Sequence, residues 1–190
     1  MENNKNLTIE ETFSLATKNH QEGKTDIAQN LYNKILEINP NHSSALNNIA
    51  IIFINLKDFK KAKECYEKAI EINPNYAHAH NNLGTIFEDL GDNQKAKECY
   101  EKAIEINPNY ADAHNNLGIT SKELGEIEKA KECFEKAIEI NPNYADAHNN
   151  LGTVFFELKE NLKAKDCYQK AIKLNPDNAD AHNNLGVIFK

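Results

Sequence analysis

The sequence lacks several features that mark particular classes of protein. No stretch approaches the roughly 18 consecutive apolar residues of a membrane-spanning helix. The first twenty residues have no basic start followed by an apolar run, so we expect no secretory signal and a cytoplasmic chain. Lysine and arginine together number 22 against 29 acidic residues, which leaves a net charge of −7. This balance argues against a nucleic-acid partner and against an anionic membrane surface.

Patterns for catalysis and metal binding are missing as well. The sequence has no Cys-x-x-Cys pair, no phosphate-cradling glycine loop and no nucleophile with a base at helical spacing. Its four cysteines recur at intervals of 34 residues, which indicates one repeated packing position rather than disulfides or a metal site. They are Cys65, Cys99, Cys133 and Cys167. We therefore expect reduced thiols, no metal, no cofactor and no enzymatic activity.

A repeat of 34 residues is the strongest signal in the chain. Prolines fall at this interval, at Pro40, Pro74, Pro108, Pro142 and Pro176. Around them the chain nearly copies itself, as in KAKECYEKAIEINPNYAHAHNNLG and KAKECYEKAIEINPNYADAHNNLG. This period resembles that of tetratricopeptide repeat proteins, which stack antiparallel helix pairs. The resemblance implies an all-α fold, a right-handed α-solenoid superhelix with a long concave groove.

The repeat predicts a single domain over residues 1–190. Its expected parts are a lead-in (1–8), a degenerate repeat (9–42), four whole repeats (43–76, 77–110, 111–144 and 145–178) and a half repeat (179–190). Position 1 of successive repeats is then Ile9, Ser43, Ala77, Ala111, Ala145 and Ala179. The position numbers used below count from these residues.

Each repeat is expected to form two helices, over residues 77–90 and 93–106 in the third repeat. Gly91 and Gly125 suit the left-handed residue that ends the first helix, and Asn-Pro suits the end of the second. Asn109 and Asn143 are candidate N-caps of the next helix. Histidines recur at position 4 and are expected to pack in or beside the core rather than to bind metal. They are His80, His114, His148 and His182.

Two rows of asparagine lie on the arc of the first helix that is opposite the core stripe. Position 5 holds Asn47, Asn81, Asn115, Asn149 and Asn183, and position 6 holds Asn48, Asn82, Asn116, Asn150 and Asn184. Asparagine is a mediocre helix former, but its amide offers two donors and an acceptor to the backbone of an extended peptide. Duplication of one ancestral unit would also account for both rows.

The run His-Asn-Asn-Leu-Gly resembles the superhelical repeats that precede the catalytic part of O-linked N-acetylglucosamine transferases. That resemblance implies that the position-6 asparagines line the groove and hold peptide backbone. Ser14 occupies this slot in the first repeat, so the row should fail there. Selectivity would come from variable neighbours, which are Thr85, Ile119 and Thr153 at position 9 and Glu88, Lys122 and Phe156 at position 12. Glu88 is expected to receive a basic side chain and Phe156 an apolar one.

These patterns predict a non-catalytic scaffold that binds an extended peptide or partner chain in the groove. The alternative is an N-terminal, substrate-recruiting region of a larger enzyme, such as a transferase of the family named above. The half repeat carries Leu185, Ile188 and Phe189 on its core arc without a second helix. Self-association through this end is therefore a further expectation.

Overall fold

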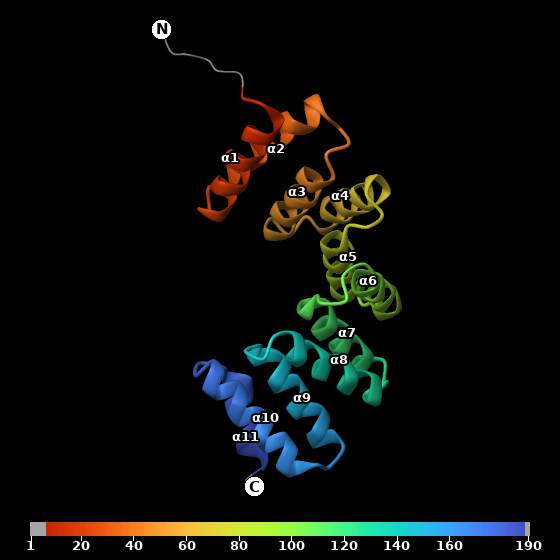
Figure 1. Cartoon of the computed structure of the whole chain (residues 1–190), viewed down its shortest axis with the longest axis vertical. Helices are drawn as coiled ribbons and strands as arrows, with labels where there is room; N and C mark the ends of the chain where they lie inside the picture. The colour runs from red at the N-terminus through yellow and green to blue at the C-terminus, as the bar shows by residue number, and fades with distance from the viewer. Residues whose placement is uncertain (1–6, 189–190) are drawn as a thin grey trace. The chain divides into compact units, whose positions relative to one another are not determined.

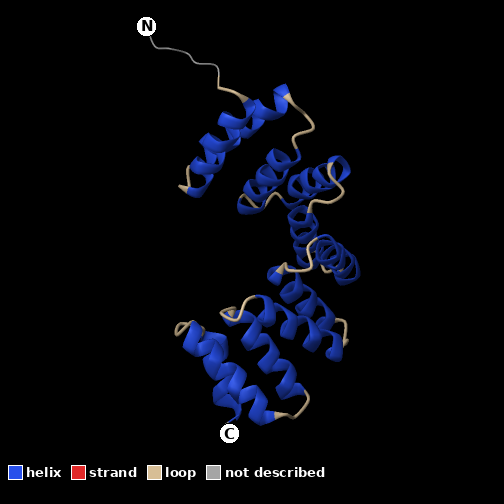
Figure 2. Ribbon diagram, in the orientation of Figure 1, coloured by secondary structure: helices blue, strands red, loops and turns tan. Residues whose placement is uncertain are grey.

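The computed structural model describes residues 7–188, and every regular element within this range is an α-helix (Figures 1 and 2). The chain divides into two compact units, with the boundary between Ile86 and Phe87. The first unit contains α1 (Ile9–Gln21), α2 (Thr25–Ile38), α3 (Ser43–Asn55), α4 (Phe59–Ile72) and most of α5 (Ala77–Asp89). The second contains the end of α5, followed by α6 (Asn93–Ile106), α7 (Ala111–Glu123), α8 (Ile127–Ile140), α9 (Ala145–Glu157), α10 (Asn161–Leu174) and α11 (Ala179–Ile188).

Helices that follow one another in the sequence pack side by side within each unit. In the first unit α1 contacts α2, α2 contacts α3 and α3 contacts α4. In the second unit α6 to α11 make contacts in chain order. The odd-numbered helices begin at the residues expected at position 1, namely Ile9, Ser43, Ala77, Ala111, Ala145 and Ala179. The prediction of an all-α fold built from consecutive helix pairs is confirmed.

The turn inside each pair depends on one residue with a positive φ at position 15. Gly91 and Gly125 hold φ values of 76° and 78°, as their place after the first helix predicts. Gly23 occupies the same slot in the first repeat. In the second and fifth repeats the slot holds Lys57 and Lys159, with φ values of 60° and 62°. These lysines adopt a backbone conformation that costs an L-residue with a side chain roughly 1–2 kcal/mol.

The expected N-caps at Asn109 and Asn143 are wrong. The residues that precede α7 and α9 are Tyr110 and Tyr144, and neither gives a side-chain cap. The asparagine that organises this turn is the one before proline, as in Asn107, whose Oδ1 accepts from the Asn109 amide at 3.2 Å. Asparagine bonds readily to the backbone two residues on, so it stabilises the turn rather than the next helix.

Small and large side chains alternate in the core. Alanines of the second helices are fully buried, and beside them lies an aromatic ring at position 24. The ring of Phe134 reaches the backbone at Gly118, where an added Cβ would lie 2.6 Å from Cε1 of that ring. Gly152 and Tyr168 stand in the same relation, also at 2.6 Å. Glycine at position 8 therefore permits the close approach of two helices.

The half repeat is partly packed. Leu185 and Ile188 lie against a core cluster of the second unit that includes Leu151 and Tyr168, whereas the side chain of Val187 is 50% exposed. Phe189, which was expected on the same arc, lies outside the described residues.

Candidate functional site

The two asparagine rows differ in burial. Position 5 is buried in the second, third and fourth repeats, where Asn47, Asn81 and Asn115 are 5%, 6% and 4% exposed. All the position-6 asparagines are partly exposed, and they are Asn48, Asn82, Asn116, Asn150 and Asn184. Position 6 is therefore a row that a ligand can reach, and in these three repeats position 5 lies behind it.

The asparagines of the first unit are joined by hydrogen bonds between their side chains. Asn81 Nδ2 donates to Asn82 Oδ1 at 3.3 Å, and Asn82 Nδ2 donates to Asn47 Oδ1 at 3.4 Å. Asn47 Nδ2 in turn donates to Asn48 Oδ1 at 3.1 Å. A position-6 amide therefore accepts from its own repeat and donates to the repeat before it.

This series of bonds ends on a tyrosine in the first repeat. Asn48 Nδ2 donates to the Tyr32 hydroxyl at 3.0 Å, and that hydroxyl donates to Thr17 Oγ1 at 3.4 Å. Position 5 of the first repeat is Phe13, which has no amide to offer. The buried hydroxyl of Tyr32 thus stands in for the missing asparagine.

The second unit repeats the bond between repeats. Asn150 Nδ2 donates to Asn115 Oδ1, and Asn184 Nδ2 donates to Asn149 Oδ1, both at 3.1 Å. We call these side-chain bonds of the two units, together with the Tyr32 link, the amide relay. The sequence revealed the two rows but not the hydrogen bonds between them, because the register between neighbouring helices sets these distances.

In the third repeat, the tyrosine at position 24 also contacts the residue at position 12. Tyr100 donates from its hydroxyl to Glu88 Oε2 at 2.8 Å. Burial raises the pKa of the Glu88 carboxyl, the hydrogen bond from Tyr100 opposes this, and the nearby Glu123 and Asp89 add to the rise. Glu88 is thus a half-buried acid that a cation would stabilise in its charged form.

The other variable positions line the same arc with mixed chemistry. Lys122 Nζ lies 3.7 Å from Glu157 Oε1, so a ligand competes with an internal ion pair at this point. The ring of Phe156 is 38% exposed. Thr85 is exposed, whereas Ile119 and Thr153 are partly buried. Thr153 Oγ1 donates to the Asn149 carbonyl at 3.2 Å.

The position-4 histidines fasten each helix pair to the turn before it. Their Nε2 atoms lie 2.9–3.1 Å from the carbonyl oxygens of Pro74, Pro108, Pro142 and Pro176. Burial lowers the pKa of His114 and of His148, so the neutral imidazole is favoured and Nε2–H donates to the carbonyl. Among residues 7–188 no histidine, cysteine or acidic residues gather in a group that could hold a metal ion.

The thiols are enclosed by the packed helices. No disulfide joins the four cysteines, all of which lie in the described range. Burial raises the pKa of Cys133 and of Cys167 to about 11, which keeps both protonated at neutral pH.

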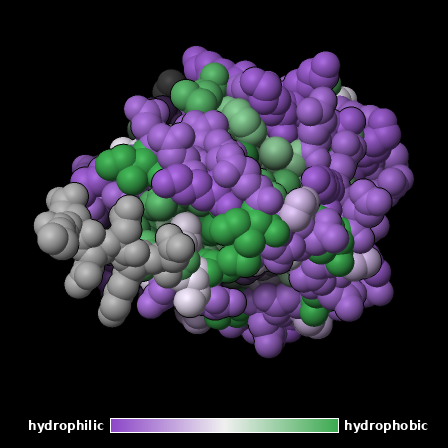
Figure 3. All heavy atoms as spheres, turned by 90° about the horizontal axis from the view of Figure 1, so that it is seen from above, coloured by the Kyte–Doolittle hydropathy of each residue, from purple (hydrophilic) through white to green (hydrophobic). Residues whose placement is uncertain are grey.

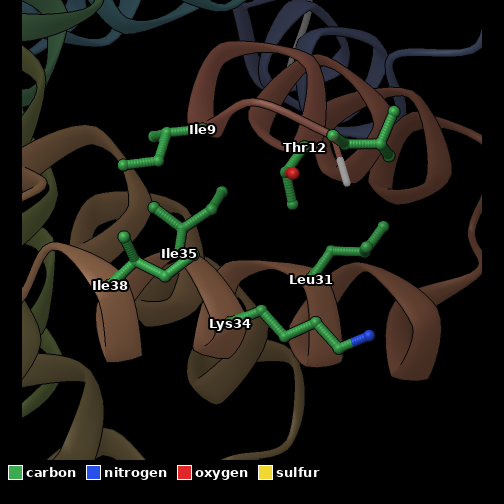
Figure 4. Close-up of a pocket in the computed structure, with 7 residues that line it drawn as sticks. Ile9, Thr12, Leu31, Lys34, Ile35 and Ile38 are labelled. Atoms are coloured by element: carbon green, nitrogen blue, oxygen red, sulfur yellow. The ribbon is translucent and has the colours of Figure 1, made fainter. Parts of the chain in front are cut away.

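A separate apolar cavity of about 510 Å³ lies between α1 and α2 (Figure 4). Ile9 and Thr12 face Leu31, Ile35 and Ile38 across it. Thr12 stands at position 4, which holds leucine or histidine in every later repeat. The face of the molecule drawn in Figure 3 is mostly hydrophilic, with several smaller hydrophobic groups.

The fold and the site define a class of helical repeat protein with 34 residues per helix pair and a polar row on each first helix. Within this class, a family model described as "Tetratricopeptide repeat" matches residues 41–109 and 75–143. A second model with the same description matches residues 133–166, and a model described as "TPR repeat" matches residues 152–190. The chain belongs to the tetratricopeptide repeat family.

Several solved structures share this fold. MamA is 27% identical with a TM-score of 0.73, over 86% of this chain and 96% of MamA. YrrB, described as a TPR protein with an unusual peptide-binding site, is 24% identical with a TM-score of 0.71, over 90% of this chain and 89% of YrrB. PilF of Pseudomonas aeruginosa is 22% identical with a TM-score of 0.84, over 95% of this chain and 88% of PilF.

A curated relative is matched over a shorter stretch. The uncharacterized protein ycf37 of Pyropia yezoensis is 51% identical over 41 residues, which are 22% of this chain and 23% of that protein. The match thus spans less than a quarter of the relative's length and says nothing of its activity. None of the helices within residues 7–188 combines the length and the apolar character needed to cross a bilayer.

Proposed function

We propose that this chain is a non-catalytic scaffold that binds an extended peptide or a segment of a partner chain along a concave groove lined by the position-6 asparagines. The observation that carries the proposal is the partial exposure of this row in every repeat from the second onward. Each side-chain amide can donate to a backbone carbonyl and accept from a backbone N–H. A further support is that YrrB, a protein of the same fold, is described as having a peptide-binding site.

The experiment is a selection from a random peptide library, followed by calorimetry on the parent and on a variant with Asn82→Ala, Asn116→Ala and Asn150→Ala. A net hydrogen bond contributes about 0.5–1.5 kcal/mol, so the triple variant should lose roughly 2–4 kcal/mol of binding free energy. Helix content should survive because alanine is the better helix former.

A matched control changes three exposed residues on the second helices, with Glu98→Ala, Glu132→Ala and Gln169→Ala. This control should bind the selected peptides as the parent does. If the asparagine variant folds normally and retains parental affinity, the row is an inherited trace of duplication and the proposal is wrong.

Side-chain selectivity is proposed for positions 9 and 12. Glu88 would take a lysine or arginine of the ligand, because a cation relieves the repulsion from Glu123 and Asp89. Phe156 would hold an apolar side chain on its exposed ring. Peptides selected by the Glu88→Gln variant should lose their preference for a basic residue at one site and keep the apolar one.

The second candidate function is a substrate-recruiting region of a larger, O-GlcNAc-transferase-like enzyme. It rests on the His-Asn-Asn-Leu-Gly run alone. The reading frame of the gene beyond Lys190 decides between this role and an independent scaffold.

Self-association through α11 is a third proposal, supported by the exposed Val187. Light scattering over a concentration series should show a rise in mass that Val187→Lys removes. A parent that stays monomeric at every concentration contradicts it.

A further inference from the structure

The side-chain amide of asparagine is ambiguous as a binding group. It presents a donor end and an acceptor end of nearly equal shape, and rotation by 180° about the last side-chain torsion exchanges them. A row of freely turning amides would present a mixture of donors and acceptors to a ligand. It would also lose conformational entropy whenever a ligand selected one orientation.

In this chain the exchange is blocked by neighbouring amides. Asn82 can donate to Asn47 Oδ1 and accept from Asn81 Nδ2 only in one of its two orientations. Asn48 is held in the same manner by Asn47 on one side and by the Tyr32 hydroxyl on the other. If either amide turned over, two donors or two acceptors would face each other.

The groups that hold the position-6 amides are themselves fixed by burial. Asn47 is 5% exposed and Tyr32 fully buried, so neither has solvent as a ready alternative partner. A buried polar group that loses its hydrogen bond is costly, and linked bonds polarise one another. The buried members of the relay therefore set the orientation of the exposed ones.

We propose that the position-5 asparagines of the amide relay and Tyr32 are positioning residues, which fix the orientation of the position-6 amides and so prepare them for a ligand backbone that they do not touch themselves. This inference rests on the proposed binding of a peptide by position 6. It assigns a binding effect to side chains that lie behind the binding row.

The fourth repeat shows that phenylalanine fits at position 24, which bears on the variant Tyr32→Phe. Position 24 holds tyrosine in four repeats and Phe134 in the fourth, and Phe134 is fully buried in a packed core. Phenylalanine is thus compatible with this slot. Tyr32→Phe should fold like the parent while it deprives Asn48 Nδ2 of its acceptor.

The test uses the full chain with two variants and one control. The variants are Tyr32→Phe and the double change Asn47→Leu with Asn115→Leu, which removes the position-5 amide at similar side-chain size. The control is Asn183→Leu, the same substitution at an exposed position-5 residue. The first readout is the set of side-chain amide signals of Asn48, Asn82 and Asn150 in NMR spectra without ligand, which reports hydrogen exchange and rotation at each amide.

The second readout is the affinity for a peptide that the parent selects from a random library. We expect faster exchange at Asn48 in Tyr32→Phe and at Asn82 and Asn150 in the double variant. In both variants the affinity should be about threefold to tenfold weaker than that of the parent, with helix content unchanged. The control should match the parent in both readouts. Unchanged amide signals and unchanged affinity in Tyr32→Phe and the double variant would overturn the inference.

The position-6 variant distinguishes a failure of the positioning role from a failure of the proposed function. If the triple alanine variant described above loses binding while the position-5 variants retain it, peptide binding stands and the positioning role fails. If the triple variant itself retains full affinity, the proposed function fails and the positioning role fails with it.

Discussion

Individual side chains in this protein depart from their repeat in ways that have energetic consequences. Ser121 is the clearest example, because it occupies position 11, where the second, third and fifth repeats hold phenylalanine. Its side chain is fully buried, and its Oγ has no hydrogen-bond partner within the described structure. The hydroxyl has therefore been removed from water without compensation.

Replacing this residue by alanine should stabilise the protein. We expect Ser121→Ala to raise the free energy of unfolding by about 1 kcal/mol, since it deletes an unsatisfied buried group and improves helix propensity. Denaturation with urea, followed by circular dichroism, measures the change. The neighbouring Thr120 donates to the Asn116 carbonyl at 3.1 Å, so Thr120→Val serves as the comparison and should give no gain.

The lysines at position 15 give a second prediction at this scale. Lys57→Gly and Lys159→Gly should each stabilise the fold by about 0.5–1 kcal/mol, which is the relief of positive φ less the added freedom of the unfolded chain. Gly125→Ala is the reciprocal change. A Cβ there would meet no atom within 4 Å, so its cost would come from φ alone. Equal denaturation midpoints for parent and variants would show that the lysine conformation carries no strain.

At the scale of single elements, the bond from a position-4 histidine to the preceding proline carbonyl holds each helix pair to its turn. Burial lowers the pKa of His114 and His148 below the ordinary value of about 6.5. The unfolded chain then binds protons more readily than the folded one as the pH falls below about 6.5. This contribution to stability is complete above that pH and is lost as the pH falls through the folded-state values.

The measurement is the melting temperature between pH 7.5 and pH 5. The parent should lose more stability on acidification than the double variant His114→Gln with His148→Gln, because the glutamines do not titrate. Carboxylates titrate alike in both proteins, so the difference between the curves isolates the histidines. Parallel curves would mean that the imidazoles are not desolvated.

The helices themselves were predictable because the 34-residue period, the prolines and the glycines at position 15 recur in nearly identical copies. The third repeat illustrates this, since residues 77–90 and 93–106 were expected and α5 and α6 cover Ala77–Asp89 and Asn93–Ile106. The helix caps were not predictable, because the asparagine before proline and the one after it are equally plausible from sequence.

The candidate site was predictable only in part. Its residue types and their common arc follow from the helical period of the repeat. The burial of Asn47, Asn81 and Asn115 and the bond from Tyr32 to Asn48 do not, because they depend on the offset between adjacent helix pairs. The bond from His114 Nε2 to the Pro108 carbonyl was not predictable either, because it depends on the path of the turn between these two residues.

At the scale of the whole molecule, charge should bias the choice of ligand. The net charge is −7, and the proposed binding arc contains Glu88, Glu123 and Glu157 beside Lys122, the one lysine of that arc among the described residues. Long-range attraction speeds the association of oppositely charged partners and is screened by salt. We expect library selection to return peptides of net positive charge whose affinity falls between 50 and 500 mM NaCl. Selected peptides that are acidic, or whose binding ignores salt, would contradict this expectation.

The hydrogen bonds of the amide relay also have a common direction along the chain. In each of its bonds between repeats, the donor lies in the later repeat and the acceptor in the one before it. Within each unit, the bonded amides therefore present donor and acceptor groups in the same order along the chain, so a polypeptide backbone bound in one direction would pair differently from one bound in the reverse direction. A retro-inverso ligand keeps its side chains in place but exchanges every backbone N–H with a C=O. A protein that holds its ligand through this relay should reject such a mimic, and it would therefore recognise the direction of a chain as well as its side chains.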